Sequence, residues 1–125
     1  MTPEIEALAR RAVACKGWRL MPGMLDSDGW RYSGESKWAH WWWHPEEDQG
    51  ELPLKQVMGT PDLSDPGTLG CLLSLVREAW RDPKGSVYYL APIETEPGWF
   101  AEFGAHAELY ATEAEALVTA LETAP

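Results

Sequence analysis

Three segments of the chain repeat apolar residues at the three- and four-residue spacing of an amphipathic helix, over residues 3–16, 67–81 and 112–123. At or just before the start of each segment lies a residue whose side-chain oxygen can accept a hydrogen bond from a first-turn amide, namely Thr2, Asp65 and Thr112. Proline follows two of these caps, at the first helical position, where its missing N–H leaves no hydrogen bond unmade. We therefore predict three helices, none of them long enough to be stable without burying its apolar stripe.

Between the helical segments the pattern is that of strands bounded by turn residues. Residues 18–25 and 29–33 are predicted to form one hairpin, and residues 86–92 and 98–104 to form a second. A further short strand is predicted over residues 38–43, because aromatic side chains favour strands.

Strands joined in hairpins pair in antiparallel order, and amphipathic helices must cover a sheet to bury their stripes. The predicted fold class is therefore α+β, an antiparallel sheet of four to five strands with three helices, arranged as an α-β-α sandwich. A single domain is predicted over residues 1–125, because a chain of this length can bury one core. The alternative is a two-layer α+β fold, with all helices on one face and the tryptophan-rich segment on the other.

Residues 33–60 form an excursion rich in tryptophan, in which three tryptophans are consecutive. Consecutive residues cannot all face one side of a strand, so at least one indole is expected to point outward, as at an interaction surface. The predicted binding surface consists of Trp38, His40, Trp41, Trp42, Trp43, His44, Glu46, Glu47 and Asp48. The alternative is a flap packed over the protein's own sheet. The remaining tryptophans are predicted to belong to the core: Trp18, Trp30, Trp80 and Trp99.

The charge of the chain is -10 and is unevenly distributed. Residues 1–45 contain six Lys or Arg and five acids, a net charge of +1, whereas residues 46–125 contain four and fifteen, a net charge of -11. Direct binding of nucleic acid is disfavoured, because it depends on neutralising phosphates. A protein partner with a basic surface would complement this charge. The alternative is that the acidic residues only confer solubility.

The sequence offers little that points to catalysis, a cofactor or a metal. Cys15 and Cys71 lie on predicted helices as small buried residues, and no phosphate loop or nucleophile motif is present. His40 and His44, four residues apart, can face the same side, but two histidines are a weak metal signature. We therefore predict a protein that is not an enzyme and has no cofactor and no metal. The two cysteines, the absence of an apolar run of about 20 residues and the absence of a signal-peptide pattern predict a reducing cytoplasm and no membrane association.

Two parts of the chain resemble a known family. The first is Ala9–Arg19 (ARRAVACKGWR) with the following Met21-Pro22-Gly23-Met24, and the second is Pro61–Leu73 (PDLSDPGTLGCLL), completed by EAEAL at residues 113–117. Together they are similar to a family of small, largely uncharacterised bacteriophage proteins, related to the phage α-β-α sandwich domain. The resemblance covers residues 1–32 and 61–125, supplies no catalytic residues, and implies a phage or prophage protein acting in the cytoplasm of a host bacterium.

These observations lead to three hypotheses about function. The first is a non-enzymatic phage accessory protein that binds a host protein and inhibits or sequesters it, including an anti-defence role. The second is a small-ligand binding protein that stacks nucleotide bases on exposed tryptophan. The third is a homo-oligomeric structural phage protein, such as a homodimer whose tryptophans meet across a two-fold axis.

Overall fold

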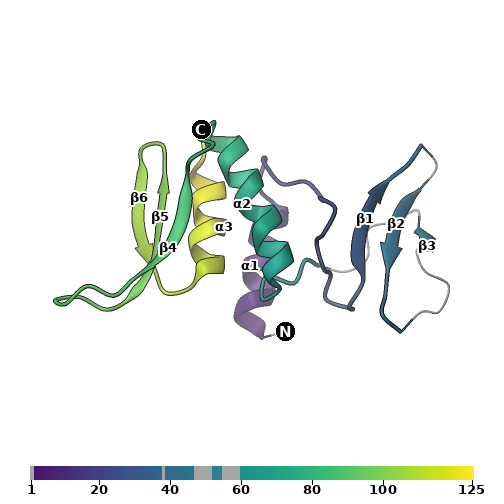
Figure 1. Ribbon diagram of the computed structural model, residues 1–125, viewed down its shortest axis with the longest axis horizontal. Coiled ribbons are helices and arrows are strands. Elements are labelled where there is room, and N and C mark those ends of the chain that lie inside the picture. The colour runs from purple at the N-terminus through teal and green to yellow at the C-terminus, as the bar shows by residue number, and fades with distance from the viewer. Residues whose placement is uncertain (1, 38, 47–51, 55–59) are drawn as a thin grey trace.

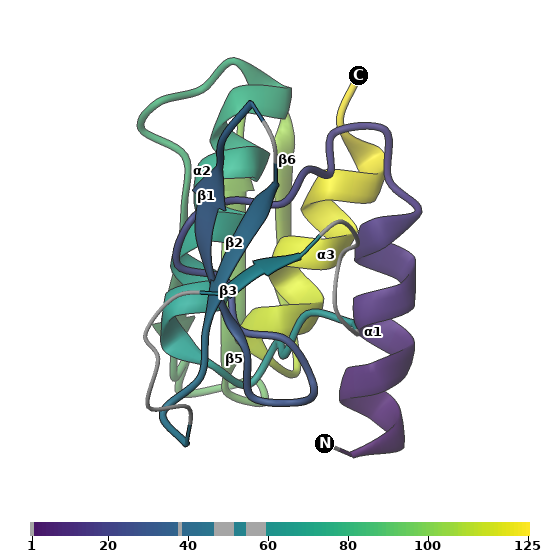
Figure 2. The ribbon, with the colours of Figure 1, turned by 90° about the vertical axis from the view of Figure 1, so that its right-hand side faces the viewer.

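The computed structural model describes residues 2–37, 39–46, 52–54 and 60–125, and its elements form three layers (Figure 1). The middle layer holds the helices α1 (Pro3–Val13), α2 (Pro66–Trp80) and α3 (Glu113–Thr123). One outer layer is an antiparallel sheet of β1 (Arg31–Glu35), β2 (His40–Trp43) and β3 (Leu52–Leu54). The other is an antiparallel sheet of β4 (Ser86–Leu90), β5 (Gly98–Phe103) and β6 (His106–Tyr110). Figure 2 views the molecule from the β1–β3 side, with the helices behind that sheet.

The α+β class, with three helices and antiparallel strands, is confirmed, but the order of the layers differs from the predicted single-sheet sandwich. The strands form two sheets with the helices between them, and all three helices lie on one side of β4–β6 (Figure 1). The reason lies in the edges of β1. One edge pairs with β2, and the other meets the preceding segment, where Leu25 bridges to Arg31 and the amide of Tyr32 donates to Met24 O. Because both edges are occupied by local partners, β1 cannot join the second hairpin.

The helices begin at the predicted caps. Side-chain oxygens of the three cap residues accept the expected hydrogen bonds, Thr2 from the Ile5 amide, Asp65 from the Thr68 amide and Thr112 from the Glu115 amide. The first helix ends at Val13, before the predicted residue 16, and the second ends where Arg81 adopts left-handed backbone angles. In the described part of the chain, no helix has both the length and the apolar character needed to cross a bilayer.

The strand predictions were correct except at the first position. Residues 18–25 form no strand, because Pro22 has no amide to donate and Gly23 has a φ of +102°, so that only the stretch from Gly23 to Leu25 pairs with β1. The short strand predicted over 38–43 is confirmed as β2, and both strands of the second hairpin are confirmed as β4 and β5. Strands β3 and β6 were not predicted. The first lies in the segment interpreted as a surface excursion, and β6 is a largely exposed edge strand without clear alternation.

The core lies where α3 packs against both neighbouring helices and the β4–β6 sheet. Helix α3 buries six residues, and the indole N–H of Trp80 on α2 donates to Ala120 O at 2.7 Å. Trp18, Trp80 and Trp99 pack against this core, as predicted. Trp30 is half-buried and instead contacts the ring of His44, 5.0 Å between centroids.

An ion pair joins the β1–β3 sheet to the helical layer. The Arg31 guanidinium donates two hydrogen bonds to the carboxylate of Asp65, at 3.0 and 3.2 Å, and a third to Gly23 O at 2.7 Å. The guanidinium holds the pKa of Asp65 below its ordinary value, with further support from the Thr68 amide. Because Asp65 also caps α2, this one carboxylate orients both the helix and the start of β1.

Candidate ligand-binding cavity

Strand β2 directs its tryptophans to opposite faces of its sheet. Trp42 lies opposite Tyr32 in the register, their ring centroids are 5.0 Å apart, and Trp42 is only 1% exposed. Its neighbour Trp43 is 43% exposed. Trp41 is half-buried, and its indole N–H donates to Ser36 Oγ at 3.0 Å. At least one indole of the segment is therefore exposed, as predicted, while another belongs to the interior.

Both histidines of this segment make structural hydrogen bonds. His40 Nδ1 lies 2.9 Å from the Tyr32 hydroxyl. His44 Nδ1 accepts from the Glu46 amide at 3.1 Å, and His44 Nε2 lies 3.2 Å from Asp28 O, to which it must donate. With both ring nitrogens engaged, His44 has no lone pair left for a metal. Within the described ranges, no group of three or more His, Cys, Asp or Glu is placed to hold a metal ion.

The predicted binding surface is divided between the two faces of the β1–β3 sheet. Trp42 is buried on one face, and Trp43 is exposed on the other. Glu46 is exposed beyond the end of the strand. The predicted residues Trp38, Glu47 and Asp48 lie outside the described residues.

A cavity of about 400 Å³ lies beside the buried face, and we call it the sheet–helix cavity. Its wall is mostly apolar and includes Val13, Trp18, Leu20, Met24, Leu25 and Trp42. Arg10, Asp26, Thr60 and Pro61 complete the lining. Cavities of this size with an apolar lining and a few polar groups are typical of small-molecule sites. Of the six residues predicted for a binding surface that the structure describes, Trp42 alone lines this cavity.

Five separate segments position the lining of the sheet–helix cavity. The last turn of α1 contributes Arg10 and Val13, the loop after it contributes Trp18 and Leu20, and β2 contributes Trp42. The segments 24–26 and 60–61 are held together by an antiparallel bridge between residues 26 and 61. The cavity thus lies at the junction of the helical layer and the β1–β3 sheet.

Asp26 is the buried charged group in this lining. It opens the turn before β1, where its Oδ1 accepts the amide N–H groups of Asp28 and Trp30, both at 2.9 Å, and Gly29 takes a φ of +89°. Burial raises the pKa of Asp26, against the lowering effect of those two amides. Its second carboxylate oxygen, Oδ2, is buried and has no hydrogen-bond partner.

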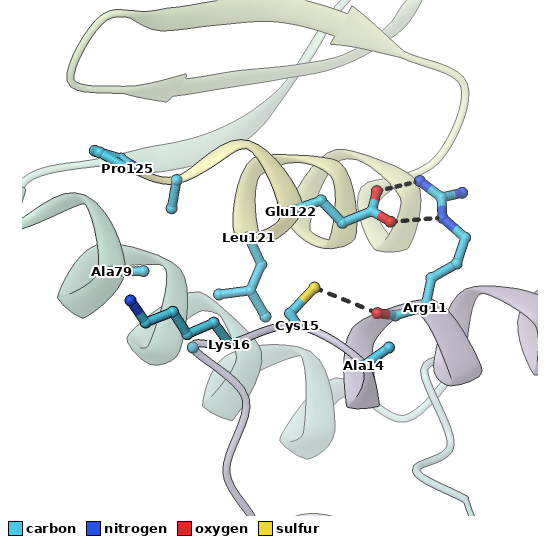
Figure 3. Close-up of a pocket in the computed structure, with 10 residues that line it drawn as sticks. Arg11, Ala14, Cys15, Lys16, Ala79, Leu121, Glu122 and Pro125 are labelled. Carbon is cyan, nitrogen blue, oxygen red and sulfur yellow. Dashed lines mark hydrogen bonds and ion pairs between the residues drawn. The ribbon is translucent and has the colours of Figure 1, made fainter.

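A second cavity, of about 520 Å³, lies between the ends of α1 and α3 (Figure 3). Two of its charged side chains satisfy each other, because Arg11 donates two hydrogen bonds to the carboxylate of Glu122 and lowers its pKa. The Cys15 thiol donates to Arg11 O at 3.3 Å, and burial raises its pKa, so it is a poor nucleophile. The Arg11–Glu122 pair and the Cys15 thiol of this helix-end cavity are therefore already engaged within the protein, and we take the sheet–helix cavity as the candidate site.

No protein-family model, curated protein or solved structure matches the chain. The similarity to small phage proteins stays a prediction, and the interpretation of the site depends on its geometry.

Sequence reasoning did not identify the sheet–helix cavity. Asp26 is of a residue type common in turns and caps one here, and Trp18 was predicted as a core residue and packs against the core. The sequence feature that pointed toward this cavity is the tryptophan-rich segment, because it contains the lining residue Trp42. No spacing rule connects Trp42 with Val13 or Asp26, because these residues meet only when the layers pack.

Proposed function

We propose that this protein binds a small, flat, largely apolar ligand in the sheet–helix cavity, and that it acts as a binding protein rather than an enzyme. The observation that carries the proposal is an apolar cavity with two indole side chains, Trp18 and Trp42, in its wall. Indole faces favour flat aromatic rings, and stacking of one ring on an aromatic side chain contributes about 1–3 kcal/mol. The ionisable residues of the described lining, Arg10 and Asp26, include no nucleophile paired with a base, which supports binding over catalysis.

The proposal retains the small-ligand hypothesis but favours uncharged rings over nucleotides. Binding of a phosphate depends on cationic side chains, and among the described residues that line the sheet–helix cavity the one cation is Arg10. Its guanidinium is exposed and already bonded to Glu6 at 3.1 Å. The buried Asp26 carboxylate in the same wall would repel a phosphate. An uncharged ring avoids both difficulties.

Titration of the full chain with naphthalene, followed by calorimetry and by amide NMR spectra, tests the proposal. We expect saturable binding of one equivalent, with shifts at residues that line the sheet–helix cavity. Val13→Trp should weaken binding at least about tenfold, equivalent to about 1.4 kcal/mol, by filling the cavity from a position that is 46% exposed and can accept a larger side chain.

Lys16→Trp is the matched control, because Lys16 lies just beyond the same helix but lines the helix-end cavity. It should leave the affinity for naphthalene unchanged. Absence of binding by the wild-type chain would refute the proposal. So would a loss of binding in the Lys16→Trp variant together with full affinity in the Val13→Trp variant.

The outer face of the β4–β6 sheet supports a second function, binding of a host protein with a basic surface. Tyr88, Phe100 and Leu109 form a row across the three strands, and Tyr88 and Leu109 are exposed. They lie on the face opposite to the core residues Ala101 and Phe103. The chain after residue 84 has seven acids and no Lys or Arg, and one of these acids, Glu102, accepts a hydrogen bond from the Tyr88 hydroxyl in this row. Apolar anchors within an acidic field suit a basic partner.

A purified partner, captured from bacterial lysate, would decide whether this row is the interface. We expect its affinity to fall at least about tenfold, or about 1.4 kcal/mol, in the variant carrying both Tyr88→Ser and Leu109→Ser, and to fall as salt rises. Trp43→Ser is the control for the predicted tryptophan surface and should have no effect. Full affinity in the double variant, or loss only in the Trp43→Ser variant, would refute this interface. A dimeric mass of the chain alone, lost in the double variant, would instead support the homo-oligomer.

A further inference from the structure

Two polar side-chain atoms of the described residues are buried without a hydrogen-bond partner, and both belong to residues that line the sheet–helix cavity. They are Asp26 Oδ2 and Trp42 Nε1, and the two residues are 4% and 1% exposed. Proteins rarely leave such atoms unpaired, because a buried polar atom without a partner loses its hydration and gains nothing in return. By contrast, the other buried polar side chain, Thr68, both donates and accepts within the fold.

The two unpaired atoms belong to different segments of the cavity wall, the turn before β1 and strand β2. The amide of Asp26 donates to Trp30 O, immediately before β1, and β1 pairs in turn with β2, where Tyr32 lies opposite Trp42. The backbones of Asp26 and Trp42 are therefore separated by at least two strand spacings, about 10 Å. A ligand that satisfies both atoms must carry two separate polar groups, one for each atom.

The chemistry of the two atoms specifies what each edge must carry. An indole N–H is a donor only, so the edge near Trp42 must carry an acceptor. An ionised carboxylate accepts only, so the edge near Asp26 must carry an N–H or O–H. The remaining wall is apolar, so further ring nitrogens would lose hydration without finding partners.

On the basis of the proposed function, we propose that the sheet–helix cavity binds a flat, uncharged bicyclic heterocycle with a ring N–H at one edge and a carbonyl at the opposite edge, as in a 4-quinolone. The N–H donates to Asp26 Oδ2 and the carbonyl accepts from Trp42 Nε1. The hydrocarbon part of the ring system contacts the apolar wall that includes Val13 and Leu25.

Four probes test this inference on the full chain by calorimetry: 4-quinolone, chromone, naphthalene and hypoxanthine. Chromone has the shape and carbonyl of 4-quinolone but a ring oxygen in place of the N–H. We expect 4-quinolone to bind at least about tenfold more tightly than chromone and than naphthalene. Hypoxanthine, a more polar oxopurine with additional ring nitrogens, should bind more weakly than 4-quinolone.

Asp26→Asn is the matched variant. The asparagine Oδ1 can still accept from the amides of Asp28 and Trp30, while its NH₂ group replaces the unpaired acceptor with a donor. The preference for 4-quinolone over chromone should disappear in this variant. Trp42→Phe should weaken binding of 4-quinolone and chromone alike, because it removes the indole N–H that both carbonyls need.

The outcomes separate the inference from the proposed function. If naphthalene binds but wild-type protein binds 4-quinolone and chromone equally, the inference is wrong and the proposed function stands. If no probe binds, both are wrong. The comparison of 4-quinolone with chromone is made on the wild-type chain, so it remains decisive even if a variant fails to fold.

Discussion

Replacement of Phe103 by alanine is expected to lower the free energy of unfolding by about 3–5 kcal/mol, a large part of the stability of a small domain. Phe103 is the last residue of β5, has no exposed surface, and belongs to the core cluster formed with α2 and α3. Its removal leaves a cavity that the surrounding helices and sheet cannot close completely. Urea denaturation followed by circular dichroism measures the effect.

Phe100→Ala provides the control on the same strand. Phe100 lies on the outer face of the sheet, is half-buried, and contacts Tyr88 at 5.6 Å between ring centroids. Loss of this pair should lower the free energy of unfolding by only about 0.5–1.5 kcal/mol. Equal losses from Phe100→Ala and Phe103→Ala would contradict the assignment of the two faces.

Gly85 gives an independent check on the packing of Phe103. A Cβ atom at Gly85 would overlap the ring of Phe103 at Cδ1. Gly85→Ala should therefore destabilise the wild-type chain by about 1–3 kcal/mol through overpacking. In the Phe103→Ala background the added methyl group occupies vacated space, so its effect should fall close to zero. Additive effects in this double-mutant cycle would show that the two residues are not in contact.

Replacement of Trp42 by alanine is the second change expected to have a large effect, again about 3–5 kcal/mol in the free energy of unfolding. The buried Trp42 ring packs against Tyr32 and forms one wall of the sheet–helix cavity. Without it, Tyr32 loses its aromatic partner and the wall of the sheet–helix cavity loses an indole ring. Urea denaturation with matched buffers provides the measurement.

Trp43→Ala, at the adjacent position, should change stability by no more than about 1 kcal/mol, because much of this indole remains in water. The two variants, Trp42→Ala and Trp43→Ala, compare the same residue type at consecutive positions of one strand. Similar losses from Trp42→Ala and Trp43→Ala would mean that the strand does not direct the two rings to opposite faces.

The helices were predictable from the sequence because their signals are local. Thr2, Asp65 and Thr112 each cap a helix through a hydrogen bond that spans only three residues. The second hairpin was predictable for the same reason, since β4 and β5 each consist of a short run rich in aromatic or β-branched residues bounded by turn residues. Local hydrogen bonds and periodicity suffice for such elements, whatever surrounds them.

The order of the layers was not predictable from those signals. A sheet assembles through its edges, and the sequence pattern of β1 does not say that its second edge is occupied by the segment at Leu25. Strand β6 follows β5 through a tight turn at Gly104, which has a φ of +52°, but its largely exposed residues show no alternation. Both features depend on which strands pair, and long-range packing determines that pairing.

The sequence by itself determined the α+β class, the three capped helices, the acidic second half and the presence of at least one exposed tryptophan. Tertiary structure alone decided which tryptophan that is, because the register of β2 against β1 places Trp42 beside Tyr32 and leaves Trp43 in solvent. It also created the sheet–helix cavity, whose lining comes from segments separated by up to about half the chain. A cavity forms only when layers pack, so no local pattern in the sequence encodes it. The same packing leaves Asp26 Oδ2 and Trp42 Nε1 buried and unpaired.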